Sequence, residues 1–153
     1  MSKNNPGASI VAGLIPVGSA GVEIGVWDGD SSEEFLERAG HVYLVDPWPK
    51  RDEQYDYVVR RFKHARATIH RMTSEKFFKW FADKVDWVYI DGAHDYLHVL
   101  ADLYGAENIL KADGVIYGDD YGKKEGVKEA VDEFCRVRGR NLELLGLSQY
   151  AIT

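Results

Sequence analysis

The sequence predicts an α/β fold: a mixed sheet of seven strands, five parallel and two in a C-terminal hairpin, with helices on both faces. Five short segments rich in apolar, β-branched or aromatic residues alternate with helical patterns, which is typical of a parallel sheet covered on both sides. Two more apolar segments close the chain and indicate a hairpin. Three of the parallel strands end abruptly at carboxylates, as strands do at a ligand-binding edge.

Length and composition bound the fold before any motif is considered. The chain has 153 residues, of which 45% are hydrophobic, enough for one domain with a sizeable core. We expect an N-terminal extension over residues 1–20 and a single domain over residues 21–153. The net charge of -6 argues against a general nucleic-acid binder, and the single cysteine, Cys135, excludes an intrachain disulfide and a cysteine metal cluster.

No membrane or export segment is predicted. The sequence holds no run of about 18 apolar residues, the length that a transmembrane helix needs. Residues 8–17 are largely apolar, but the region before them is barely basic and Pro16 interrupts the run. We therefore expect a cytoplasmic protein with no membrane partner.

The start of the chain holds a short helix and the first strand. A helix is predicted over residues 10–14, with Ser9 as its N-cap and Pro16 as its stop. The first strand is predicted over residues 21–26, the apolar run G-V-E-I-G-V. It leads into a loop rich in turn residues.

The next helix and strand follow that loop. Acidic residues suited to a first helical turn come after Ser31 and Ser32, so one of these serines is predicted as the N-cap of a helix that runs to about residue 39. Gly40 is its terminator. The second strand is predicted over residues 41–45.

The middle of the chain continues the alternation. Apolar spacing predicts a helix over residues 53–64, a strand over residues 67–70 and a helix capped by Thr73 or Ser74. The strand over residues 85–90, V-D-W-V-Y-I, is the stretch around which the other elements are organised.

The last third completes the sheet. Apolar residues at three-and-four spacing define two long helices. The predicted elements, in chain order, are a helix over residues 96–110, a turn over 111–114, a strand over 115–118, a helix over 124–138, and hairpin strands over 141–145 and 149–153.

Carboxylates follow three of the predicted strands directly. Asp46 ends the second strand, Asp91 ends the strand over residues 85–90, and Asp119 with Asp120 ends the strand over residues 115–118. The carboxyl ends of parallel strands meet at one edge of a sheet, where open α/β sheets bind their ligands. We therefore expect these side chains to converge on one functional rim.

The loop after the first strand is the first candidate site. Gly25 and Gly29 would let the backbone approach a ligand closely, yet the pattern is not the G-x-G-x-x-G of dinucleotide enzymes. Glu23 disfavours bound phosphates and favours a cationic ligand, unless it only caps a backbone turn. Asp46 follows about 20 residues later and could accept both hydroxyl hydrogens of a ribose, unless it forms a simple Asp-Pro turn.

Four motifs together resemble the class I S-adenosylmethionine-dependent methyltransferases. They are E-I-G-V-W-D-G-D-S, L-V-D-P-W, Y-I-D-G-A-H-D-Y with Asp102 downstream, and G-V-I-Y-G-D-D-Y. More narrowly, they are similar to the macrolide-sugar O-methyltransferases related to macrocin O-methyltransferase, with catechol O-methyltransferase more distant. The resemblance runs from about Gly21 to the C-terminus, and it implies a Rossmann-like sheet and S-adenosylmethionine as cofactor.

The resemblance also implies a cofactor site. The implied residues are Glu23, Gly25, Trp27, Gly29, Ser31, Asp46, Pro47, Thr73, Ser74 and Asp91. Within this set, residues from the first strand and its loop are implied at the methionine end, Asp46 at the ribose, and Thr73 with Ser74 near the adenine.

A metal and a base are implied as well. In metal-dependent members of that family, the positions of Asp91, Asp119 and Asp120 bind a divalent cation, and the position of His94 is a catalytic base. The residue types agree, because converging carboxylates repel each other unless a cation neutralises them, and oxygen ligands suit Mg²⁺. Such a cation would lower the pKa of a substrate hydroxyl, and His94, near Asp91, would take its proton. The plainer alternatives are a surface histidine and a solvated acidic turn.

The acceptor is expected to be a small hydroxylated molecule, a sugar or a catechol-like compound, and not a nucleic acid. Candidate substrate walls, or else core residues, are the aromatic side chains Trp27, Trp48, Tyr96 and Tyr121. The histidines without a comparable setting, predicted as structural or surface residues, are His41, His64, His70 and His98. Little helical material precedes the first strand, and the stretch over residues 10–15 is apolar, so we expect a homodimer in which a second chain helps to cover the site.

Two other classes of protein remain open from the sequence. One is a module that binds S-adenosylmethionine without catalysis. The other is a nucleotide-binding Rossmann protein that uses NAD, which the missing third glycine and Glu23 both disfavour.

Overall fold

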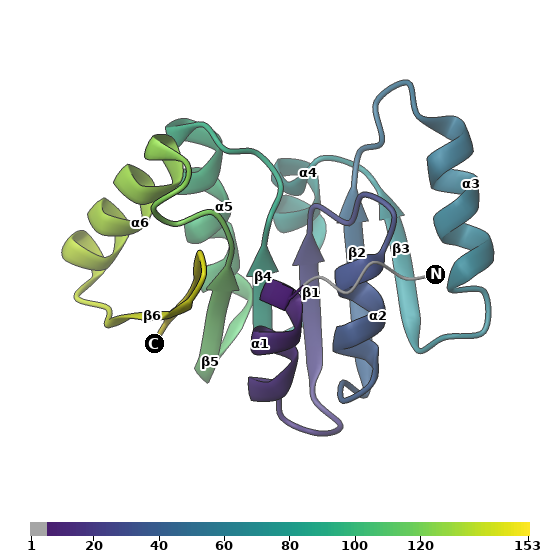
Figure 1. Cartoon of the computed structure of the whole chain (residues 1–153), viewed down its shortest axis with the longest axis horizontal. Helices are drawn as coiled ribbons and strands as arrows, with labels where there is room; N and C mark the ends of the chain where they lie inside the picture. Colours follow the sequence, from purple (N-terminus) through teal and green to yellow (C-terminus); the bar gives the residue numbers. More distant parts are fainter. Residues whose placement is uncertain (1–5) are drawn as a thin grey trace.

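The predicted mixed sheet is confirmed. The computed structural model describes residues 6–153, which form a seven-stranded sheet of order β3-β2-β1-β4-β5-β7-β6 (Figure 1). The first five strands along the chain pair in parallel, and β7 pairs antiparallel with both β5 and β6. The strands are β1 Ala20–Ile24, β2 His41–Asp46, β3 Ala67–Arg71, β4 Val85–Ile90, β5 Leu110–Gly118, β6 Leu142–Gly146 and β7 Gln149–Ile152.

Helices cover both faces of this sheet. They are α1 Pro6–Leu14, α2 Asp30–Leu36, α3 Asp52–Arg61, α4 Ser74–Trp80, α5 Tyr96–Ile109 and α6 Glu125–Arg138. One hydrophobic cluster joins the sheet to α1, α2 and α3, and another joins it to α4, α5 and α6. Figure 1 shows α3 near one edge of the sheet and α6 near the other. Among the described residues, no helix has the length and apolar character needed to cross a membrane.

The central strand β4 is buried on both faces. Its side chains alternate, so that Trp87 and Tyr89 enter the cluster with α1 to α3, while Val88 and Ile90 enter the cluster with α4 to α6. The strand lies between β1 and β5 and pairs in parallel with both. This explains its continuous apolar sequence, and it places the residue that follows, Asp91, at the middle of the carboxyl edge.

Two predicted helix starts were wrong. The first helix begins at Pro6, four residues before the predicted start, with the proline in the first turn, where its missing N–H costs nothing. The second helix has Gly29 as its N-cap rather than Ser31 or Ser32. Ser32 cannot cap the helix, because its side chain is buried and its hydroxyl donates to Glu23.

The predicted turn over residues 111–114 was also wrong, because β5 runs through it. The pairing of β4 with β5 shifts there, from Val85 opposite Leu110 to Trp87 opposite Val115. The extra residues form an irregularity in the strand, which an ion pair between Lys111 and Asp86 holds at 2.7 Å.

The N-terminal helix belongs to the core. Ala8, Val11 and Ile15 are fully buried against the sheet and α2. Ser9 donates a hydrogen bond of 2.7 Å to Glu34, and Arg38 donates one of 2.8 Å to the Ile15 carbonyl. The described part of residues 1–20 therefore packs on the domain, while Leu14 and Val17 stay exposed.

Candidate cofactor and active site

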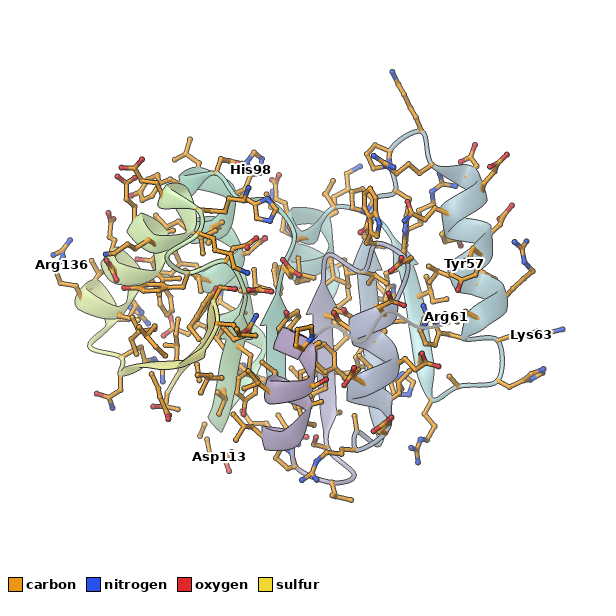
Figure 2. All side chains as sticks on the ribbon, in the orientation of Figure 1. Tyr57, Arg61, Lys63, His98, Asp113 and Arg136 are labelled. Atoms are coloured by element: carbon orange, nitrogen blue, oxygen red, sulfur yellow. The ribbon has the colours of Figure 1, made fainter. Side chains whose placement is uncertain are left out.

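A cavity of about 760 Å³ opens at the carboxyl edge of the sheet. It is lined by Ile24, Gly25, Val26, Trp27, Asp28, Asp30, Ser31, Val45, Asp46, Pro47, Pro49, Arg51, Thr73, Ser74, Asp91, Gly92, Ala93, His98 and Asp102. Figure 2 shows His98 at this end of the molecule, whereas Asp113 lies at the opposite end. Of the ten predicted cofactor residues, all but Glu23 and Gly29 line the cavity.

Two glycines shape the loop between β1 and α2. Gly25 has a φ of 88°, and a Cβ there would lie 2.2 Å from the carbonyl oxygen of Asp91. Only glycine therefore allows the ends of β1 and β4 to approach so closely. Gly29 also has a φ of 88°, and a Cβ on it would lie 2.4 Å from the Phe62 ring. Gly29 supports the loop from behind and does not line the cavity.

The loop after β1, residues 25–30, is bonded to the loop after β2. Asp46 accepts hydrogen bonds of 3.1 Å from the backbone N–H groups of Val26 and Trp27, and one of 2.8 Å from that of Trp48. The buried Trp48 ring donates at 2.8 Å to the Trp27 carbonyl. These bonds hold Trp27 at a φ of 56°, which is uncommon outside glycine.

Asp46 therefore stabilises the loop after β1, a structural role that the sequence did not predict. Its carboxylate offers about four acceptor positions, and backbone groups take three of them. One position remains for a ligand hydroxyl at the cavity wall. Trp48, a candidate substrate wall from the sequence, is buried behind the loop instead.

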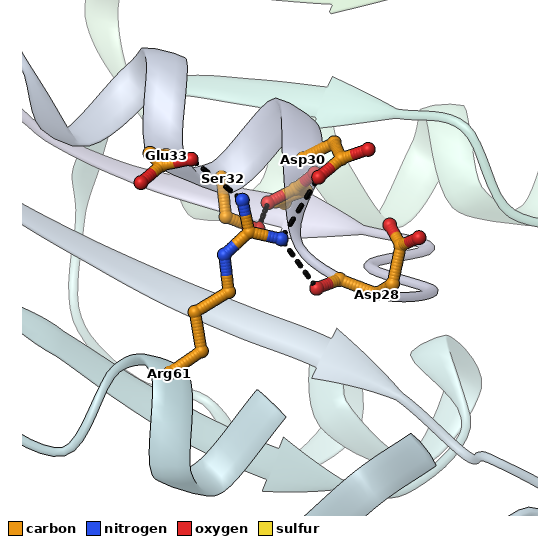
Figure 3. A network of polar contacts seen from close by, with 6 residues as sticks. Asp28, Asp30, Ser32, Glu33 and Arg61 are labelled. Carbon is orange, nitrogen blue, oxygen red and sulfur yellow. Dashed lines mark hydrogen bonds and ion pairs between the residues drawn. The ribbon is translucent and has the colours of Figure 1, made fainter. Parts of the chain in front are cut away.

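Arg61 of α3 fixes the same loop from the other side (Figure 3). Its guanidinium donates to the Asp28 carbonyl at 2.9 Å, to the Asp30 carboxylate at 2.8 Å and to Glu33 at 2.6 Å. The Arg61 side chain is only 14% exposed, so these bonds are partly shielded from solvent. Asp28 and Asp30 both line the cavity, which makes Arg61 a support of its wall.

Glu23 lies beneath the cavity, fully buried, and accepts a hydrogen bond from the Ser32 hydroxyl. Its other carboxylate oxygen has no hydrogen-bond partner among the described residues. Burial is the largest cause that raises the pKa of Glu23, to about 8, and the charges of Asp91 and Asp46 add to it. The carboxyl group is therefore mostly protonated at neutral pH in the ligand-free protein.

Three polar residues gather at the α4 and α5 side of the cavity. Thr73 caps α4 by accepting from the Lys76 N–H, and Ser74 and Asp102 lie beside it, joined by a hydrogen bond. Asp102 is 3% exposed, and burial raises its pKa to about 6. His98 is exposed and pairs with Asp95 at 2.8 Å, yet it also lines the cavity.

Sequence reasoning gave neither Asp102 nor His98 a role at the site. Asp102 entered only as part of a motif, and His98 was taken as a structural or surface residue. The two residues are four apart on α5, so they share one face of that helix. That spacing, next to a strand that ends at Asp91, is the signal that could have found them.

A second cluster lies beside the cavity, where β4 and β5 end. Asp91, His94 and Asp120 each place one ligand atom within 4.8 Å of the others. His94 Nε2 lies 2.9 Å from Asp120 Oδ2 and 3.9 Å from Asp91 Oδ1. The pKa of Asp91 is raised to about 7, mainly by burial and then by the charges of Asp119 and Asp120. The cluster is thus a concentration of negative charge that a cation would relieve.

Asp119, predicted as a third metal residue, has other contacts. Its Oδ1 accepts from the Ser148 hydroxyl and, at 2.6 Å, from the Asp120 N–H. It is not among the three residues whose ligand atoms meet within 4.8 Å. Asp119 therefore ties the end of β5 to the turn between β6 and β7, and it orients Asp120, which has a φ of 68°.

The fold and the cavity define a class of protein. A Rossmann-like mixed sheet, a glycine loop after β1 and a cavity lined by carboxylates suit a cofactor that carries a sulfonium and an ammonium group, and the chain is an S-adenosylmethionine-dependent methyltransferase. The family model described as a methyltransferase domain (methyltransferase family 24) matches residues 22–121, so the chain belongs to this methyltransferase family.

Solved structures share the fold over nearly the whole chain. A Staphylococcus aureus protein described as a caffeoyl-CoA O-methyltransferase has a TM-score of 0.74 and 17% identity, over 95% of this chain and 82% of its own. Aeropyrum pernix fibrillarin with natively bound S-adenosyl-L-methionine has a TM-score of 0.71 and 14% identity, over 99% of this chain and 74% of its own.

A third structure contains the fold as a part of a longer chain. Pyrococcus abyssi Trm5b has a TM-score of 0.64 and 20% identity over 95% of this chain, which spans only 46% of the length of Trm5b. No curated protein matches the sequence. At these identities the likeness to solved structures shows the fold and not the acceptor.

Proposed function

We propose that this enzyme transfers the methyl group of S-adenosylmethionine to a hydroxyl oxygen of a small molecule, with a divalent cation, Mg²⁺, held at the sheet rim. The observation that carries this proposal is the meeting of Asp91, His94 and Asp120 within 4.8 Å beside the cofactor cavity. Two carboxylates and an imidazole at the end of neighbouring strands are the groups that oxygen activation requires.

The donor set fits a hard cation. Asp91 and Asp120 would hold it through carboxylate oxygens, and Asp119 has its Oδ2 free of the bonds that occupy its Oδ1. When bound, the cation would lower the pKa of a hydroxyl on the acceptor. The raised pKa of Asp91 agrees with a site that lacks positive charge without its metal.

His94 would act as the base. Its ring nitrogen Nε2 faces both carboxylates, and its side chain is 45% exposed, so an acceptor hydroxyl can reach it. A neutral imidazole can accept a proton from such a hydroxyl. The protein must also hold the acceptor oxygen in line with the methyl group. The cavity wall and Asp91 would together provide this positioning.

The acceptor class follows from charge and from the rim. The net charge of -6 disfavours a nucleic acid, and the acidic cluster suits a neutral polyol or catechol-like molecule better than a polyanion.

The homodimer and the cytoplasmic location stay predictions. Within residues 10–15, Val11 and Ile15 are buried in the chain's own core, whereas Leu14 is exposed.

A chelation experiment tests the proposed metal. Methyl transfer from labelled S-adenosylmethionine to a panel of sugars and catechols should stop in excess EDTA and return with Mg²⁺. Calorimetric binding of S-adenosylhomocysteine should persist in EDTA, because the cofactor cavity is built mainly from the loops after β1 and β2. Full transfer in EDTA would remove the metal from the mechanism. Cofactor binding with no transfer to any member of the panel would favour the non-catalytic module.

A further inference from the structure

The cofactor cavity has an uneven charge. Five aspartates line it, namely Asp28, Asp30, Asp46, Asp91 and Asp102. Among the described residues that line it, Arg51 is the only arginine or lysine. The carboxylates suit the sulfonium and the ammonium of S-adenosylmethionine, but the carboxylate of its methionine part needs a different partner.

Arg51 is held in place without being neutralised. It occupies the N-cap position of α3, and its guanidinium lies 4.2 Å from the ring centroid of Trp27, which also lines the cavity. Arg51 forms no ion pair with any described residue. Its neighbours differ, since Arg61 is paired with Asp30 and Glu33, and Arg71 with Asp52.

The backbone of the loop after β1 offers little to an anion. The N–H groups of Val26 and Trp27 are bonded to Asp46, that of Gly25 to the Val45 carbonyl, and that of Gly29 to the Val26 carbonyl. A ligand carboxylate at this loop would therefore find most backbone donors already occupied. A side-chain donor has to supply the charge-assisted hydrogen bonds instead.

We propose that Arg51, supported by the Trp27 ring, binds the methionyl carboxylate of the cofactor. This inference rests on S-adenosylmethionine as the cofactor of this cavity. The guanidinium is planar and can give two parallel hydrogen bonds to a carboxylate, while its face stays on the indole. In this arrangement the carboxylate end of the cofactor meets the only arginine or lysine among the described lining residues, and its cationic groups meet the aspartates.

Calorimetry with a matched pair of ligands tests the proposal. S-adenosylhomocysteine and its decarboxylated analogue differ only in the carboxylate, and both are titrated into the wild-type protein, Arg51→Ala, Arg51→Lys and the control Arg60→Ala on the exposed side of α3. We expect Arg51→Ala to weaken S-adenosylhomocysteine by roughly five- to tenfold, as for one partly exposed charged contact. The decarboxylated analogue should bind wild type and Arg51→Ala equally, and Arg51→Lys should recover part of the loss.

Each other outcome has a defined meaning. Equal weakening of both ligands by Arg51→Ala would overturn the proposal, because the effect would then not pass through the carboxylate. Unchanged binding of S-adenosylhomocysteine, with a raised KM for the acceptor, would also overturn it and assign Arg51 to the acceptor. Failure of the wild-type protein to bind either ligand would instead count against the cofactor itself. Melting temperatures show whether each variant is folded.

Discussion

The two halves of the rim are built differently. The cofactor half, the loops after β1 and β2, is cross-bonded by Asp46, Trp48 and Arg61, so most of its polar groups already have partners. The half after β4 and β5 gathers Asp91 and Asp120 with His94, and repulsion among its carboxylates contributes to the raised pKa of Asp91.

This difference separates a preformed site from an incomplete one. The hydrogen bonds of the cofactor half fix the loop before any ligand binds. The entropic cost of ordering this loop on binding is therefore smaller. The other half gathers carboxylates whose mutual repulsion the proposed cation would relieve. We therefore expect mutations in the first half to change cofactor affinity, and mutations in the second half to change turnover.

The largest expected effect belongs to the second half. His94→Ala should lower kcat by on the order of 10²–10⁴, the typical loss for a general base. The dissociation constant of S-adenosylhomocysteine should stay close to that of wild type, because His94 does not line the cofactor cavity. Single-turnover methyl transfer and calorimetry measure the two quantities, with the exposed His64→Ala as control. A loss of cofactor affinity as large as the loss of turnover would erase the distinction between the halves.

The next effect belongs to Asp46. Asp46→Ala removes the acceptor of three backbone N–H groups together with the ribose contact expected of this residue, and we expect cofactor binding to weaken by roughly 1.5–3 kcal/mol. At saturating cofactor, kcat should change little. Calorimetry and steady-state kinetics test this, with Asp56→Ala on the exposed side of α3 as the matched control. Unchanged affinity in Asp46→Ala would remove the residue from the site.

Arg61 should have a smaller effect through the loop that it supports. Arg61→Ala leaves the Asp28 carbonyl and two carboxylates without their donor, and the free energy of unfolding should fall by about 1–2 kcal/mol, since the network is partly exposed. Cofactor affinity should fall severalfold, and Arg61→Lys should restore part of both losses. Chemical denaturation and calorimetry measure these changes. If stability fell and affinity did not, Arg61 would support the fold and not the cofactor loop.

The smallest effect concerns pH. The pKa of Glu23 is raised from 4.5 to about 8 in the folded chain, so the folded state binds a proton more tightly than the unfolded state does. Its contribution to stability is fully present below about pH 4.5 and is lost as the pH rises to about 8. The melting temperature of the ligand-free protein should therefore fall by a few degrees between pH 6 and pH 8.5. Glu23→Gln should reduce that slope and leave the part due to Asp91, whose pKa is raised to about 7. An unchanged slope in this variant would assign the dependence to other groups.

The sequence determined the order of elements and the rim. The prediction for β4, residues 85–90, matches the structure residue for residue, because a buried strand that stops at Asp91 and Gly92 carries its own local signal. The positions of Asp46 and of the pair Asp119 and Asp120 were predicted as well, at the carboxyl ends of β2 and β5 of the same sheet, although β5 begins at Leu110 and not at residue 115. Because these strands run parallel, their carboxyl ends lie at the same edge of the sheet, whichever contacts the side chains make.

Only the tertiary structure decided which side chains share the site. Ser148 donates a hydrogen bond to Asp119, Asp46 holds the loop of Trp27, and α5 brings Asp102 into the cavity. The first two contacts join residues that are 29 and 19 positions apart in the sequence. The third depends on how α5 packs beside the cavity. A local pattern reports on its own helix or strand. The partners of a polar side chain depend on how neighbouring loops fold against each other. That arrangement is fixed only when the sheet has formed and the loops at its edge have made their hydrogen bonds.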